Sequence, residues 1–229
     1  MIHRIMKILT PVLQPAYRRY VSKTRNYRYK GITVIVKPGC FYPGFIFSTR
    51  IFLDFLDQID LADKKFLELG AGSGIISILA ARKRAVVTAS DINPVAVECI
   101  RENSIINGQQ VLAIQSDLFE NIPEEDFDYI IITPPYYPKD PLEVNDTAWY
   151  CGSHFEYFRN LFPQLRRAYH PSCEILMILS EDCDIDRIRD IARQSGLDFT
   201  IVHQEKRMGE WNYIFRIGRE TIVSDEGGN

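Results

Sequence analysis

Short apolar runs alternate with amphipathic segments through the middle of this chain. The runs are rich in β-branched and apolar residues, whereas the segments between them repeat their apolar residues at helical spacing. This pattern predicts strands over residues 64–69, 85–90, 111–115, 128–133 and 174–180, and helices over residues 73–84, 94–107, 154–169 and 184–196. Strands separated by helices of this length are typical of βαβ units, so we expect a doubly wound sheet.

The two ends of the alternation refine this picture. The run at 32–36 predicts another strand, and Ser48 is placed to cap a helix that continues to about Asp57. The strands predicted at 198–204 and 211–218 follow each other without a helix, so one of them should run antiparallel. We therefore predict an α/β fold with a Rossmann-like, doubly wound, mostly parallel seven-stranded sheet and one antiparallel strand near the C-terminus.

Charge is distributed unevenly along the chain. Residues 1–53 carry ten Lys and Arg and no acidic residue, whereas the remainder carries 17 basic against 30 acidic residues. A basic arm favours an anionic partner such as RNA, and packing of the arm on the acidic body is the alternative. Residues 2–13 have helical spacing, which Pro11 and Pro15 interrupt. The sequence does not distinguish among four roles for this segment: it could pack on the body, contact nucleic acid, lie on a membrane surface or be part of a transit peptide.

Composition is that of an ordinary globular domain, with 46% hydrophobic and 25% charged residues. There is no apolar run long enough to cross a bilayer, so we predict no stable membrane insertion. The five cysteines and four histidines lack metal-ligand spacing, which predicts no metal site and reduced thiols in a cytoplasmic protein. We predict a basic extension over residues 1–30, one domain over 31–220 and a disordered acidic tail over 221–229.

Three glycines alternate with other residues after the strand predicted at 64–69. Gly70, Gly72 and Gly74 allow the backbone to turn sharply and to approach a ligand closely. The dinucleotide-binding pattern requires glycine where this chain has Ile75, which disfavours a nicotinamide oxidoreductase. Taken alone, the three glycines fit a tight turn without a ligand equally well.

Acidic residues follow the next two strands. Asp91 ends the second strand, where a carboxylate can accept hydrogen bonds from both hydroxyls of a ribose, although Asp91 and Asn93 could also cap the next helix. Asp117 follows the third strand and could accept a hydrogen bond from an adenine amine. The carboxyl ends of successive parallel strands meet along one crevice. Together with the glycines, these residues predict a nucleoside site.

The fourth strand ends in Thr133-Pro134-Pro135-Tyr136. The two prolines lack N–H donors and stiffen the backbone, which leaves carbonyls free to accept hydrogen bonds. Tyr136 offers a flat face against which a planar substrate can stack. The combination suits a conjugated amine, held by its N–H groups with its lone pair turned toward an electrophile. Taken alone, it also fits a strand ended by proline and an aromatic surface turn.

Together and in this order, the motifs resemble those of class I S-adenosylmethionine-dependent methyltransferases, specifically the small methyltransferase-domain group. That group includes ribosomal RNA guanine-N2 and release-factor glutamine methyltransferases. The resemblance extends from about residue 31 to residue 218. It is carried by Pro38-Gly39-Cys40-Phe41, the Glu68–Gly74 turn, Asp91, Asp117 and Pro134-Pro135-Tyr136.

The resemblance implies S-adenosyl-L-methionine as the cofactor and methylation of a planar nitrogen as the reaction. It implies that the cofactor is bound by Glu68, Gly70, Ala71, Gly72, Gly74, Asp91, Ile92, Asp117 and Leu118. It also implies that the methyl acceptor is oriented by Thr133, Pro134, Pro135 and Tyr136, and we expect Phe41 and Tyr42 to close the pocket. The family usually has Asn at the position of Thr133, whose hydroxyl also accepts but has a shorter reach.

Two acceptor classes follow from the resemblance. RNA or a ribonucleoprotein is favoured by the ten basic residues within 1–53. It is favoured also because about 30 residues before the domain are too few for the helical substrate domain of release-factor enzymes. Protein glutamine is the alternative. A module that binds S-adenosylmethionine without catalysis is a third possibility, supported by Thr133. The sequence does not predict an oligomeric state.

Overall fold

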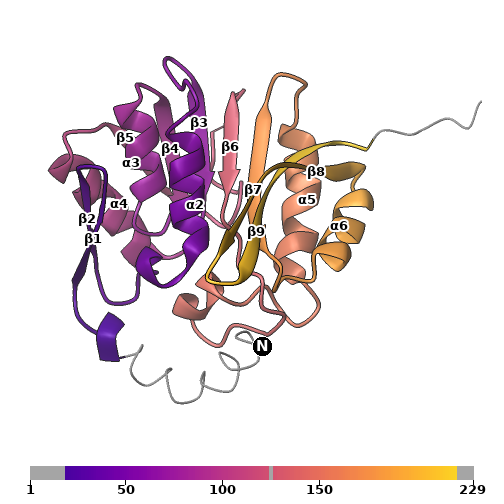
Figure 1. The fold of residues 1–229 in the computed structure, drawn as a ribbon, viewed down its shortest axis with the longest axis horizontal. Coiled ribbons are helices and arrows are strands. Elements are labelled where there is room, and N and C mark those ends of the chain that lie inside the picture. Colours follow the sequence, from indigo (N-terminus) through magenta and orange to yellow (C-terminus); the bar gives the residue numbers. More distant parts are fainter. Residues whose placement is uncertain (1–18, 124–125, 221–229) are drawn as a thin grey trace, which may run out of the picture.

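The computed structural model describes residues 19–123 and 126–220 of the chain. The helix predicted at 2–13 and the tail predicted at 221–229 lie outside the described residues. The described residues form a seven-stranded sheet with helices on both faces and a separate two-stranded sheet (Figure 1).

The large sheet has the strand order β5-β4-β3-β6-β7-β9-β8. Its strands are β3 (Lys65–Leu69), β4 (Val86–Asp91), β5 (Val111–Gln115), β6 (Tyr129–Ile132), β7 (Glu174–Ser180), β8 (Leu197–Arg207) and β9 (Glu210–Arg219). The pairs from β5 across to β7 are parallel, and β9 runs antiparallel to both β7 and β8. The predicted fold class is confirmed, and β9 is the antiparallel strand.

Helices cover both faces of the sheet (Figure 1). One face is covered by α2 (Phe47–Leu56), α3 (Ile75–Arg82) and α4 (Pro94–Ile106), and the other by α5 (Glu156–Ala168) and α6 (Ile185–Arg193). Two of these helices begin later than predicted. Gly74 and Phe155, the residues before α3 and α5, adopt left-handed backbone angles with φ of 78° and 63°, which an α-helix cannot include.

The capping role predicted for Ser48 is wrong. Helix α2 begins at Phe47, and the residue before it, Ile46, supplies no side-chain cap. Ser48 therefore lies inside the first turn, and its hydroxyl is buried without a hydrogen-bond partner. By contrast, Asn93 caps α4 as predicted, because its side chain accepts a hydrogen bond from Val95 N at 2.9 Å.

A β-hairpin precedes the sheet. Its strands β1 (Arg25–Tyr29) and β2 (Ile32–Val36) pair antiparallel. The strand β2 was predicted and β1 was not, since β1 carries basic residues and only its last side chain, Tyr29, is fully buried. Strand β1 lies before the domain boundary predicted at residue 30, so the folded part of the chain begins earlier than that boundary.

Asn103 of α4 and Asn107, the residue that follows this helix, hold the hairpin to the domain. Asn103 accepts a hydrogen bond from Ile35 N at 2.7 Å and donates to Ile35 O at 2.8 Å and to Ser73 O at 3.0 Å. One turn later, Asn107 pairs in the same way with the N–H and C=O of Thr33, at 3.1 and 2.8 Å. The backbone N–H and C=O groups on the outer edge of β2 are thus hydrogen-bonded to these two side chains, which fixes the hairpin against α4.

The five cysteines are free and buried. In the described part of the chain, no helix combines the length and the apolar composition that crossing a membrane requires.

Replacing Asn103 by alanine should lower the free energy of unfolding by about 2–4 kcal/mol, because backbone groups of both Ile35 and Ser73 lose their hydrogen-bond partner. Asn107→Ala is the matched control, and it should cost about 1 kcal/mol because this side chain is only partly buried. Urea unfolding followed by circular dichroism measures both values. Equal losses in the two variants would contradict the proposed importance of the Asn103 contact.

Candidate functional site

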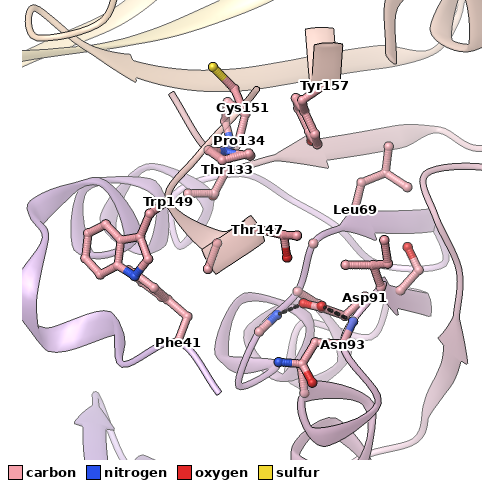
Figure 2. A pocket seen from close by; sticks show the side chains of 18 of the residues that line it. Phe41, Leu69, Asp91, Asn93, Thr133, Pro134, Thr147, Trp149, Cys151 and Tyr157 are labelled. Atoms are coloured by element: carbon pink, nitrogen blue, oxygen red, sulfur yellow. Dashed lines mark hydrogen bonds between the residues drawn. The ribbon is translucent and has the colours of Figure 1, made fainter. Parts of the chain in front are cut away.

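A cavity of about 290 Å³ opens at the carboxyl ends of the central parallel strands, close to the lower end of the roughly 300–1,000 Å³ typical of small-molecule sites. Its floor is formed by the loops that follow β3, β4 and β5, and one wall by the loop that follows β6. The outer wall comes from residues 39–43 and 141–152. Segments from most of the chain therefore meet around one space (Figure 2).

The glycine turn after β3 forms part of the floor. Gly70, Gly72 and Gly74 all have positive φ, at 71°, 53° and 78°, so all three positions favour glycine. Gly70, Ala71 and Gly72 line the cavity. Gly74 is not among the lining residues: it packs against α4, where an added Cβ would lie 3.1 Å from Ile100 Cγ1. Its glycine is explained by helix packing.

Glu68 is buried beside the turn. Its Oε2 accepts hydrogen bonds from Ser77 N at 2.8 Å and from Ser77 Oγ, so the carboxyl group satisfies the first turn of α3. Burial raises the pKa of Glu68 to about 8, and the hydrogen bonds from Ser77 oppose this only in part. At neutral pH the side chain is therefore mainly protonated in the protein alone.

Asp91 links two loops of the floor. Its Oδ2 accepts from Gly72 N at 2.8 Å and its Oδ1 accepts from Asn93 N at 2.9 Å (Figure 2). Burial raises the pKa of Asp91, and the two N–H donors oppose that rise. Each oxygen retains further lone-pair capacity for a ligand in the cavity. The neighbouring Ile92 also lines the cavity.

The loop after β5 completes the floor. Ser116 N donates to Asp91 O at 3.1 Å, which joins this loop to the one after β4. Asp117 and Leu118 both line the cavity, Asp117 exposed and Leu118 buried with φ of 48°. An exposed carboxylate beside an apolar side chain can bind a flat polar ring by its edge and by its face.

The loop after β6 presents the second set of predicted residues. Thr133, Pro134, Pro135 and Tyr136 all line the cavity. The Oγ1 atom of Thr133 is buried and has no hydrogen-bond partner, which is costly unless a ligand supplies one. The Tyr136 ring packs against Tyr137 with centroids 4.8 Å apart and against the core, and burial raises its pKa.

Most of the outer wall belongs to the long segment between β6 and α5, and hydrogen bonds join the two ends of this segment. Tyr137 N donates to Trp149 O at 3.1 Å, and Cys151 N donates to Tyr137 O at 3.0 Å. Trp149 packs edge-on against Phe41 with ring centroids 5.0 Å apart (Figure 2). Phe41 thus lines the cavity as predicted. Tyr42 does not, since its ring packs against Tyr20 of the chain before β1, at 5.4 Å.

Tyr157 is a cavity residue that the sequence did not reveal. It lies in the first turn of α5, and its side chain points into the cavity (Figure 2). Burial raises the pKa of its phenol, as do the nearby charges of Asp91 and Asp117. A tyrosine in an amphipathic helix carries no local signal of such a role, because only the packing of α5 turns it toward the floor.

The charges around the cavity have one sign. The lining residues contain four acidic side chains, Glu68, Asp91, Asp117 and Glu156, of which Glu68 is mainly protonated at neutral pH, and no Lys, Arg or His. Such a site favours a ligand with positive charge and with hydroxyl or amine donors. The arrangement can therefore hold a cationic nucleoside on the floor and a second, planar molecule against the loop after β6.

Residues 31–149 match the family model described as methyltransferase small domain. Over 90 residues the chain is 41% identical to a Methanocaldococcus jannaschii protein assigned as a protein N5-glutamine methyltransferase, covering 39% of this chain and 45% of that protein. Over 128 residues it is 31% identical to a tRNA1(Val) (adenine(37)-N6)-methyltransferase of a Flavobacteriaceae bacterium, covering 54% of each. The chain thus spans about half the length of these curated relatives.

Among solved structures, the 16S rRNA N2 methyltransferase of T. thermophilus, in complex with AdoMet and guanosine, superposes with a TM-score of 0.61. The match covers 85% of this chain and 50% of that one, at 19% sequence identity. At this identity the likeness concerns the fold.

The glycine turn provides a matched pair of substitutions. Gly74→Ala should lower the free energy of unfolding by about 2–3 kcal/mol, because the new Cβ presses on Ile100 and the left-handed φ disfavours a side chain. Gly70→Ala should cost about 1 kcal/mol, because no atom lies within 4 Å of the added Cβ and only the φ penalty applies. Thermal and urea unfolding measure both, and a larger loss in Gly70→Ala would refute the packing role of Gly74.

Proposed function

This chain belongs to the methyltransferase small domain family, and from this membership we propose that it transfers a methyl group from S-adenosylmethionine to a planar nitrogen in RNA. The observation that carries the proposal is the unsatisfied hydroxyl of Thr133 in the same cavity as Asp91. Asp91 would bind a nucleoside and Thr133 would accept a hydrogen bond from a second molecule, and both residues line the same cavity. Transfer between two bound molecules requires this arrangement.

S-adenosylmethionine is the cofactor of this family, and the residues present fit it. Bound there, it supplies an electrophilic methyl group on a sulfonium. The acidic side chains suit its positive charges, and the glycine turn at Gly70 and Gly72, where the backbone has no side chains in the way of a ligand, suits its amino-acid end. We assign the amino-acid end to Glu68, Gly70, Ala71 and Gly72, the ribose to Asp91 and Ile92, and the adenine to Asp117 and Leu118.

The loop after β6 would hold the acceptor. Thr133 Oγ1 and the Pro134 carbonyl accept hydrogen bonds from the target N–H groups, which turns the nitrogen lone pair toward the cofactor side of the cavity. Tyr136 packs against the planar group, while Phe41 and Trp149 exclude water. No strong base is needed, because the nitrogen loses its proton after its lone pair has attacked.

RNA is the first candidate acceptor. It is supported by the tRNA and rRNA methyltransferases among the relatives and by the ten basic residues within 1–53. A protein glutamine side chain is the second candidate, supported by the 41% identity to the Methanocaldococcus jannaschii protein and by a release factor glutamine methyltransferase of Aquifex aeolicus. Both acceptors present a planar N–H group of the kind that Thr133 and Tyr136 would orient.

Transfer of a tritiated methyl group into extract from a knockout strain tests the proposal. Label in the RNA fraction that is resistant to protease and sensitive to ribonuclease supports the RNA acceptor. Label in protein selects the glutamine alternative and overturns the RNA assignment. Binding of S-adenosylmethionine with no label in any fraction would overturn catalysis and leave a binding module.

Thr133→Val removes the hydroxyl and keeps the shape of the side chain. Turnover should fall by about tenfold or more, because an acceptor hydrogen bond is lost, whereas cofactor affinity should stay within about twofold. The free energy of unfolding should stay the same or rise by about 1 kcal/mol, because a buried unpaired group is removed. Thr133→Ser retains the hydroxyl and should retain most of the turnover. Unchanged turnover in both Thr133→Val and Tyr136→Ala would contradict the acceptor site.

Cofactor binding should release a proton from Glu68. The pKa of about 8 leaves this carboxyl mainly neutral at pH 7, and a cation bound beside it favours the charged form. The affinity for S-adenosylmethionine should therefore rise as the pH rises from 6 to 8, with release of up to roughly one proton. Calorimetry in buffers of different ionisation enthalpy measures the release. Glu68→Gln is the control. Protons lost by the cofactor's own amine are released with both proteins, so the difference in proton release between them belongs to Glu68.

A further inference from the structure

Exposed apolar side chains gather at the β5 edge of the large sheet. Val86, Ile105, Ile106 and Leu112 are 65%, 78%, 51% and 54% exposed. Val86 begins β4 and Leu112 lies near the start of β5, whereas Ile105 and Ile106 end α4. All four therefore lie at the amino ends of the strands, the end opposite the cavity. We call these four residues the β5 corner.

The corner includes side chains on both faces of the edge strand. Val111 and Ala113 pack against the cluster of Ala71, Ala89 and Ile100, on the face that α4 covers, so Leu112 between them points to the other face. Leu112 pairs with Thr88 in the ladder, which places Val86 on the same face, two residues along. The isoleucines at the end of α4 supply the apolar surface on the first face.

The two edges of the sheet differ in their protection. Edge strands usually carry charges or irregularities that prevent pairing with another chain. Strand β8 has both: its pairing with β9 shifts between Ile201 and His203, and its last three residues, Glu205, Lys206 and Arg207, are charged. The segment 103–116, which includes all of β5, has no charged residue.

Part of the β5 edge is occupied by the chain itself. Arg101 donates to Ala113 O at 3.2 Å and Asn121 donates to Gln115 O at 3.0 Å. Both contacts cover the second half of the strand. The open part is thus the first half, next to Leu112, where no described strand pairs on the outer side.

We propose that the β5 corner binds the same corner of a second copy of this chain across a two-fold axis. In a two-fold contact every charge near the axis faces its own equivalent, so a neutral apolar surface is complementary to itself. Residues 54–229 carry 30 acidic against 17 basic residues, and two such bodies repel each other elsewhere. RNA and anionic membranes require Lys and Arg. The segment 103–116 has neither, and the two arginines beside the corner are already in contact, Arg84 with the carboxylate of Asp63 and Arg101 with the Ala113 carbonyl.

The oligomeric state of the full chain tests this proposal. Sedimentation velocity over a wide concentration range should show a dimer for the natural protein. Leu112→Lys combined with Ile105→Lys should weaken association by about 100-fold or more, because two charges per copy are brought together at the axis. The circular dichroism spectrum and the turnover per chain should stay the same, since both side chains are exposed and far from the cavity, whereas the melting temperature should lose its dependence on protein concentration.

Ile201→Lys is the matched control, because Ile201 is 48% exposed on the opposite edge strand β8 and should leave the dimer intact. Leu112→Cys provides a positive test: mild oxidation should give a disulfide-linked dimer, and Ile201→Cys should not, since the five natural cysteines are buried. A monomer at every concentration, or a dimer that survives the double lysine variant, would overturn the proposal.

Discussion

The carboxylate of Asp91 is the contact on which the site depends. The carboxylate accepts one hydrogen bond from the glycine turn after β3 and one from the loop that precedes α4. The backbone carbonyl of Asp91 accepts a further hydrogen bond from Ser116 N, in the loop after β5. Three loops that are far apart in sequence are thereby fixed at one buried residue. A buried carboxylate without such donors would be costly, so the loops and the charge stabilise each other.

Three of the buried polar groups that line the cavity are of two kinds. Glu68 and Asp91 are bonded to backbone N–H groups and keep the floor in shape. Thr133 Oγ1 is buried without a partner, on the wall formed by the loop after β6. The first kind stabilises the protein alone, and the second lowers its stability until a second molecule arrives. This division separates the groups that keep the cavity in shape from the hydroxyl that we propose for the methyl acceptor.

The sequence predicted the elements whose signal is local. Alternating strands and helices, the cap at Asn93 and the motifs at strand ends all depend on neighbouring residues, and the sheet and its antiparallel strand followed from them. Strand β1 was missed because only pairing with β2 makes its basic residues extended. The cap at Ser48 was wrong because α2 begins at Phe47, two residues earlier than a cap at Ser48 requires. Tyr157 was missed because the orientation of a helix is set by tertiary packing.

The ring contact between Phe41 and Trp149 joins a residue near the start of the chain to one well beyond its middle. During synthesis the first of these emerges from the ribosome long before the second, and Tyr157 of α5 emerges later still. The complete cavity therefore cannot form before α5 has emerged, and S-adenosylmethionine cannot stabilise it while only the hairpin and β3–β4 fold. Ligand supply then affects the lifetime of the finished protein, while its biogenesis rests on the contacts of the chain itself.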